Sequence, residues 1–147
     1  MSVASQQFCT FMLQDEFFGV PVQQVQEVIR YQEMTRVPLV AKAVAGLINL
    51  RGQIVTAIEL RRCMGMPDRA AGQLPMNVVV RTSDGPVSLL VDDIGDVIEV
   101  SKDSYESTPQ NIPASEKKMV EGVYKLDGRL LLVLNTKQAL DAGLGAG

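Results

Sequence analysis

The chain of 147 residues contains no histidine and no tryptophan, and aromatic side chains make up only 5% of it. Without histidine, the sequence offers no Ser-His or Cys-His nucleophile, no imidazole base near neutral pH and no His-ligated metal. The two cysteines, Cys9 and Cys63, form no CxxC pair, and we expect them to be buried small apolar residues in a reducing compartment. These absences exclude most nucleophilic hydrolases and zinc sites and predict no catalytic residue and no cofactor.

Long hydrophobic runs are also missing. The longest, residues 130–134, has the length of a strand, whereas a membrane span needs roughly 18 apolar residues or more. The N-terminal residues show neither the basic nor the apolar region of a secretion signal. We therefore expect a cytoplasmic protein with no direct membrane insertion.

Positive charge is scarce. Fourteen Lys and Arg face 17 Asp and Glu, so the net charge is −3, and the acidic excess lies in the second half of the chain. Residues 1–81 carry eight basic and six acidic side chains, and residues 82–147 carry six and eleven. This balance disfavours nucleic acid as a partner, although the mild dipole suits a charged protein surface.

What the sequence does contain is a series of short β-rich runs separated by turn signals, a pattern typical of small barrels and sandwiches. It predicts an all-β fold with short helices, and about ten strands in two groups of five suggest two small barrels side by side. The predicted strands are 8–13, 17–22, 31–37, two around a turn within 45–60, 76–81, 87–91, 96–100, 120–126 and 129–134.

Three segments are predicted to be helical. The clearest is 22–29, where Val and Ile recur at helical spacing opposite a Gln- and Glu-rich face. A short helix is expected at 61–66 and a terminal helix at 135–142. The loop 67–75 is the best internal boundary, and the stretch 101–118 exceeds ordinary connection lengths, so we expect it to be mobile, functional or partly helical.

Acidic residues form the strongest candidate for a chemical site, and they are Asp92, Asp93, Asp96 and Glu99. Clustered carboxylates bind Mg²⁺ or Ca²⁺, but this spacing matches no calcium loop, and solvent-facing acids between buried apolar residues explain it as well. Protein binding is the remaining class of function. If the protein binds another protein, Glu27 and Arg51 carry opposite charges that either pair with each other or contact the partner.

Several blocks together resemble the CheW-type chemotaxis coupling proteins. These blocks are VQEVI at 25–29, VP at 37–38, VAGLINLRGQIV at 44–55 and LVDDIGDV at 90–97. The resemblance covers residues 6–142 and implies one domain of two intertwined five-stranded SH3-like β-barrel subdomains. Subdomain 1 would span about 14–80, and subdomain 2 about 6–13 plus 81–142.

The resemblance also implies an adaptor without enzymatic activity, recruited to membrane-associated receptor arrays. Its partners would be the cytoplasmic tip of methyl-accepting chemoreceptors and the regulatory domain of the histidine kinase CheA. Carried over by position, the receptor-binding residues are Val25, Glu27 and Val28 of the predicted helix, Arg51 of the turn, and Ile94 and Val97. The kinase-binding residues are not assigned.

Two alternatives stay open at this stage. A CheW-like adaptor of a related receptor–kinase pathway, for twitching motility or surface sensing, would carry the same motifs. A small metal-dependent enzyme would instead use Asp92, Asp93 and Asp96. An RNA-binding barrel would show salt-dependent binding, which this acidic composition does not predict.

Overall fold

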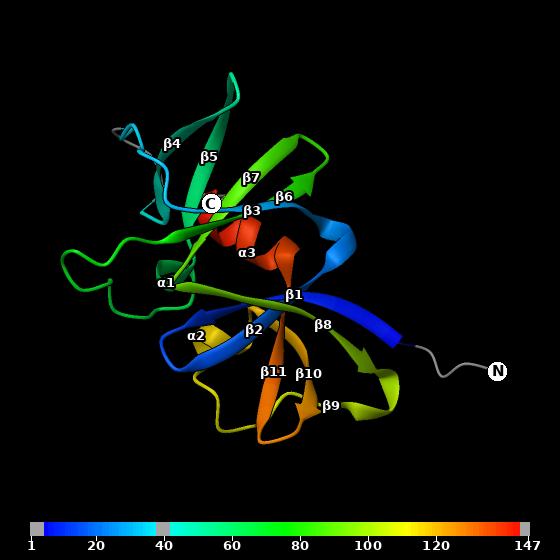
Figure 1. Cartoon of the computed structure of the whole chain (residues 1–147). Coiled ribbons are helices and arrows are strands. Elements are labelled where there is room, and N and C mark those ends of the chain that lie inside the picture. Colours follow the sequence, from blue (N-terminus) through cyan, green and yellow to red (C-terminus); the bar gives the residue numbers. More distant parts are fainter. Residues whose placement is uncertain (1–4, 38–41, 145–147) are drawn as a thin grey trace.

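The structure, a computed structural model, describes residues 5–37 and 42–144. In this part of the chain most residues lie in strands, which form one six-stranded and one five-stranded sheet with a few short helices. Figure 1 shows the five-stranded sheet in the upper part of the molecule and the six-stranded sheet in the lower part, with β1 and β8 crossing the middle. The predicted all-β class with short helices is confirmed.

The six-stranded sheet joins the two ends of the chain. Its strands are, in spatial order, β8 (Asp93–Ser101), β1 (Ser5–Leu13), β2 (Glu16–Pro21), β11 (Arg129–Leu134), β10 (Val120–Leu126) and β9 (Tyr105–Glu106). All neighbours are antiparallel except β2 and β11, which are parallel.

The five-stranded sheet is formed by the middle of the chain. Its strands are, in spatial order, β3 (Val25–Ile29), β6 (Met76–Thr82), β7 (Gly85–Val91), β5 (Gln53–Glu59) and β4 (Val44–Leu50). Here β5 and β7 are the parallel pair. In each sheet, one parallel contact thus joins strands that a hairpin cannot connect.

The α-helices are short: α1 (Leu60–Cys63), α2 (Ala114–Lys117) and α3 (Thr136–Gly143). The long predicted loop 101–118 is partly helical, since it contains a 3₁₀ turn at Lys102–Ser104 and α2, and it also contributes β9. No helix within the described ranges is long and apolar enough to cross a membrane.

The helix predicted at 22–29 is wrong. A 3₁₀ turn at Val22–Gln24 leads directly into β3, which pairs with β6. A β-bulge between Val25 and Glu27 breaks the alternation of side chains, and this produces apolar spacings that resemble a helix. The β-branched residues and the available edge of β6 favour the strand over the helix.

Each of the two sheets combines strands from distant parts of the chain, in line with the intertwined arrangement that the resemblance implied. Strand β2 lies within the range 14–80 but belongs to the six-stranded sheet, and β7 lies beyond it but belongs to the five-stranded sheet. The parallel contacts β2–β11 and β5–β7 cause this exchange. Such long-range pairings leave no local sequence signal.

One apolar core is shared by both sheets. Phe11 and Phe18 of the six-stranded sheet stack with ring centroids 5.7 Å apart, and they belong to the same buried cluster as Val78 and Leu89 of the five-stranded sheet. Two smaller clusters, around Ile48 in one sheet and around Phe8 in the other, fill the rest. The shared core ties the two sheets into one packed unit.

Candidate functional site

The structure brings Glu27 and Arg51 into direct contact. Arg51 and Gly52 form the tight turn between β4 and β5, both with positive φ (53° and 86°), and the Gly52 N–H donates to Asn49 Oδ1 at 2.8 Å. From this turn the Arg51 guanidinium donates a hydrogen bond to the Glu27 carboxylate on β3. The turn therefore fixes the arginine, and the bulged edge strand fixes its partner.

This ion pair stays open to the surroundings. The Arg51 side chain is 69% exposed and that of Glu27 is 20% exposed. The hydrogen bond from Arg51 is the largest cause that lowers the pKa of Glu27, and the same bond raises the pKa of Arg51. Both groups are charged at neutral pH, so the pair presents a fixed dipole with a free cationic side.

The valines beside the pair have different surroundings. Val25 is buried in the shared core, whereas Val28 is 37% exposed. The Arg81 guanidinium donates to the backbone carbonyls of Gln23 and Val25, at 3.2 and 2.7 Å. Arg81 thereby holds the start of β3 and the bulge that sets the position of Glu27.

Ile94 and Val97 lie on β8, at the edge of the other sheet. Val97 is 57% exposed, and Ile94 is half-buried against the shared core. Within the described ranges no hydrogen bond or ion pair joins β8 to Glu27 or Arg51. The predicted set is thus divided between two sheet edges, with Glu27 and Arg51 as its one directly bonded pair.

A buried ion cluster, which the sequence did not predict, lies at the junction of β7 and β8. The Asp92 carboxylate accepts two hydrogen bonds from Arg61 at 2.8 and 2.6 Å and one from Arg69 at 2.8 Å. Arg69 also donates to both oxygens of Glu59, at 2.5 and 2.8 Å. All four side chains are at most 10% exposed, so the charges neutralise each other away from solvent.

Asp92 is therefore a structural anion, which corrects its expected place among solvent-facing acids. Its neighbours Asp93 and Asp96 are exposed, and in the part of the chain that the structure describes no three His, Cys, Asp or Glu side chains are grouped as metal ligands. The proposed metal-dependent enzyme would need the carboxylate that Arg61 and Arg69 already occupy. The acidic cluster thus offers no support for metal chemistry.

The thiols offer no alternative nucleophile. Cys9 and Cys63 are free, and each is partly exposed rather than fully buried as expected. Burial raises the pKa of Cys63 to about 11 and also raises that of Cys9. Because the thiolate is the reactive form, both groups are weak nucleophiles at neutral pH.

Acid should weaken the buried cluster. Burial alone would raise the pKa of Asp92, but the hydrogen bonds from Arg61 and Gln14 N–H and the nearby positive charges outweigh it, so the pKa is lowered. A lowered carboxyl pKa stabilises the fold above the unfolded value of about 3.9, and this contribution is lost as pH falls through the folded value. We expect the gap in unfolding free energy between wild type and Asp92→Asn to shrink below about pH 4.

Urea unfolding at neutral pH and near pH 3 measures that gap. The exposed neighbour provides the control, since Asp93→Asn should follow the wild type at both pH values. A gap that stays constant or widens in acid would contradict a charged, paired Asp92.

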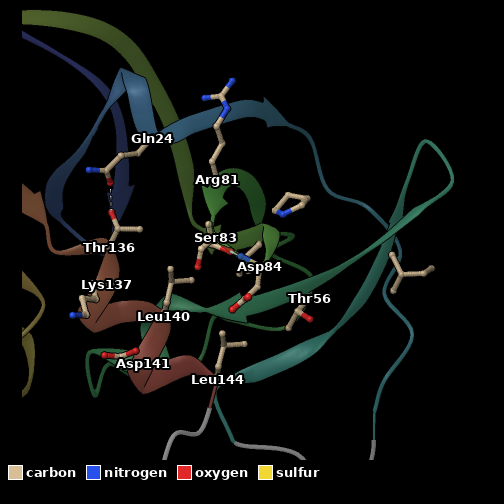
Figure 2. A pocket seen from close by; sticks show the side chains of 14 residues that line it. Gln24, Thr56, Arg81, Ser83, Asp84, Thr136, Lys137, Leu140, Asp141 and Leu144 are labelled. Atoms are coloured by element: carbon tan, nitrogen blue, oxygen red, sulfur yellow. Dashed lines mark hydrogen bonds between the residues drawn. The ribbon is translucent and has the colours of Figure 1, made fainter.

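A groove lies between α3, β5 and the β6–β7 turn. It has a volume of about 710 Å³, and Figure 2 shows Gln24 and Thr136 joined by a hydrogen bond, with Leu140 and Leu144 projecting toward β5. Its apolar lining includes Ile54, which is 62% exposed. Charges of both signs line its rim, so the groove resembles a protein-contact surface more than a reaction site.

The fold and this surface define a mostly-β protein whose exposed features suit protein contacts. The family model for the CheW-like domain matches residues 7–143. The chain is 30% identical over 131 residues to the chemotaxis protein CheW of Bacillus subtilis, covering 89% of this chain and 84% of that protein. It is 27% identical over 132 residues to CheW of Thermotoga maritima, covering 90% and 85%.

The crystal structure of the scaffolding protein TtCheW from Thermoanaerobacter tengcongensis superposes with a TM-score of 0.79 at 26% identity, covering 90% of each chain. The chain belongs to the CheW-like domain family, as the sequence motifs indicated. Membership in this family makes it a non-enzymatic chemotaxis scaffold protein.

Proposed function

We propose that this protein couples the cytoplasmic tips of chemoreceptors to the regulatory domain of the histidine kinase CheA. The observation that carries the proposal is the exposed Arg51 guanidinium, which a tight turn and Glu27 hold in place. Val28 adds exposed apolar surface next to Glu27 on the same strand. A fixed charge beside apolar area is what a helical partner needs for both register and affinity.

The surface is proposed to extend to Ile94 and Val97 on β8. Val97 would contact the receptor directly because it is exposed, whereas the buried Val25 would act by positioning β3. The protein would act in the cytoplasm, recruited to membrane-associated receptor arrays. Its effect on the kinase would be positional: a rigid adaptor biases a kinase equilibrium through its differential affinity for the two states.

Charge reversal at Arg51 tests the receptor surface. We expect Arg51→Glu to weaken binding of a receptor cytoplasmic fragment on the order of tenfold or more, because it places two carboxylates together where a partner meets a cation. The thermal midpoint should stay within a few degrees, since the Arg51 side chain is 69% exposed and an ion pair open to solvent contributes little to the free energy of unfolding. Calorimetric titration with the receptor fragment and, separately, with the kinase regulatory domain measures both affinities.

Lys125→Glu, on the exposed side of β10, is the control with the same charge change. Wild-type binding to the kinase domain but not to the receptor fragment would favour a related receptor–kinase pathway, and binding to neither would refute the proposal. Unfolding of Arg51→Glu would instead assign the pair a structural role.

The double variant Glu27→Arg/Arg51→Glu separates two explanations for a loss of binding. If the partner contacts the Arg51 cation, restoring the pair in reverse should not restore receptor affinity. If the pair serves only to hold β3 against the turn, the double variant should recover most of the wild-type affinity.

A further inference from the structure

A second groove lies between helix α1 and the segment that precedes strand β4. None of the proposed receptor residues is among its described lining residues. Its volume is about 470 Å³. Four of its lining side chains are basic, namely Arg36, Lys42, Arg62 and Arg69, and we refer to it as the cationic groove. Arg69 belongs to the buried ion cluster, so the cations available to a ligand are Arg36, Lys42 and Arg62. Its lining also includes apolar side chains, namely Tyr31, Met34, Val37, Val44, Ala45, Leu74, Pro75 and Leu90.

Backbone hydrogen bonds hold the basic residues in place. Thr35, next to Arg36, forms an isolated bridge with Leu47 through two hydrogen bonds of 2.8 Å. Gly46 permits this close approach, because a Cβ there would lie 2.7 Å from the Thr35 carbonyl oxygen. The cation at position 36 is therefore carried by a segment fixed against β4.

A hydrogen bond connects the segments that carry the other two available basic residues, Lys42 and Arg62. The Arg62 guanidinium on α1 donates to the Lys42 carbonyl oxygen at 2.9 Å, and it pairs with Asp68 at 3.1 Å. Lys42 and Arg62 thus come from segments 20 residues apart that a direct hydrogen bond joins. The basic residues at the edge of the groove are therefore distant in sequence, and the tertiary structure brings them together.

Most of this positive charge is not neutralised within the protein. Among the described residues Arg36 and Lys42 form no ion pair. Among the described residues that line the groove, Glu59 is the one acidic side chain, and Arg69 already binds both of its oxygens. A protein with net charge −3 therefore keeps a local concave site with excess positive charge.

Leu74 adds exposed apolar surface to the groove. Its side chain is 60% exposed, among the largest exposures of any large apolar residue in the described chain, and it lies beside Pro75 in the lining. An inorganic anion would satisfy the cations but leave this apolar area in water. A nucleic acid would meet an otherwise acidic protein.

We propose that the cationic groove docks an acidic peptide segment of a protein partner, with aliphatic side chains covering Leu74 and carboxylates meeting Arg36, Lys42 and Arg62. The site is formed by residues other than the proposed receptor surface, and its test does not depend on that function. Electrostatic attraction would supply rate and orientation, and the apolar contact would supply affinity.

Fluorescence anisotropy with three labelled synthetic peptides tests the proposal. A glutamate–leucine peptide should bind, a glutamate–serine peptide should bind several-fold more weakly, and a lysine–leucine peptide should not bind. In Arg36→Glu/Lys42→Glu the affinity for the first peptide should fall on the order of tenfold or more. Both side chains are exposed, so circular dichroism should show an unchanged fold.

The matched control is Lys118→Glu/Lys125→Glu, which makes the same change in net charge at exposed positions outside the groove. Equal weakening in the two double variants would mean a general charge effect and would overturn the site. The proposal would also fail if the glutamate–leucine peptide does not bind at all, or if single-stranded RNA competes with it at equal affinity.

Discussion

Replacing Asp92 by asparagine is expected to lower the free energy of unfolding by about 3 kcal/mol, because breaking a buried ion pair from one side leaves uncompensated charge. Asparagine keeps the shape of aspartate but removes its charge, and Arg61 and Arg69 are both directed at that carboxylate. For a domain of this size the thermal midpoint should fall by about 10 °C. Thermal and urea unfolding followed by circular dichroism measure both values.

The size of this effect follows from what the cluster connects. Asp92 accepts the Gln14 N–H at 2.7 Å, and its own N–H donates to the Met12 carbonyl at 3.0 Å. It thereby links the end of β7 to β1, and through Arg61 it also links to α1. A change of less than about 1 kcal/mol, comparable to that of an exposed ion pair, would show that the cluster is not desolvated.

Asp93→Asn provides the matched control, because that side chain is exposed and its one hydrogen bond within residues 5–37 and 42–144 is accepted from the N–H of Ile94, at 2.9 Å. It should leave the thermal midpoint within a few degrees of wild type. A similar loss in both variants would point to the β7–β8 junction itself and not to the buried charge.

Hairpins were the part of the fold that the sequence predicted well. The two strands predicted around a turn within 45–60 are β4 and β5, and those predicted at 120–126 and 129–134 are β10 and β11. In both hairpins a glycine, Gly52 or Gly128, supplies the positive φ that the turn needs. The parallel pairs β2–β11 and β5–β7 were not predictable in this way, since their partners lie far apart in the chain. The sequence therefore does not indicate which distant strands share a sheet.

The prediction of a helix at 22–29 failed for a different reason. The bulge at β3 shifts the side-chain alternation, so Val25 turns into the core while Val28 stays partly exposed. A single sequence cannot distinguish this shift from a helical period. The predicted pairing of Glu27 with Arg51 does not depend on the helix, because Glu27 reaches Arg51 from the strand.

The buried cluster illustrates what sequence patterns miss entirely. Asp92 and Arg61 are 31 residues apart, and Asp92 was predicted to be one of several solvent-facing acids. No periodicity or motif relates it to Arg61 or Arg69, because the loop 67–75 brings the second arginine back across the sheet junction. The pairing follows from tertiary structure alone.

Removing the Phe18 ring is expected to have an effect of about 4 kcal/mol, because large-to-small changes leave a cavity in a close-packed core. Phe18 is fully buried and stacks on Phe11 in the cluster shared by both sheets. In Phe18→Ala we expect one cooperative unfolding transition at a lower midpoint. Amide hydrogen exchange should show the same loss of protection in β6 and in β10.

Equal loss in both sheets is the informative part of this result. The cluster includes Val78 of the five-stranded sheet and Val123 of the six-stranded sheet, so a cavity at Phe18 weakens the contact between them. Phe18→Leu, which keeps most of the volume, should cost less than about 1.5 kcal/mol. If protection falls only in β10, the sheets open independently and the shared core does not couple them. The proposed positional coupling of receptor to kinase requires the coupled result.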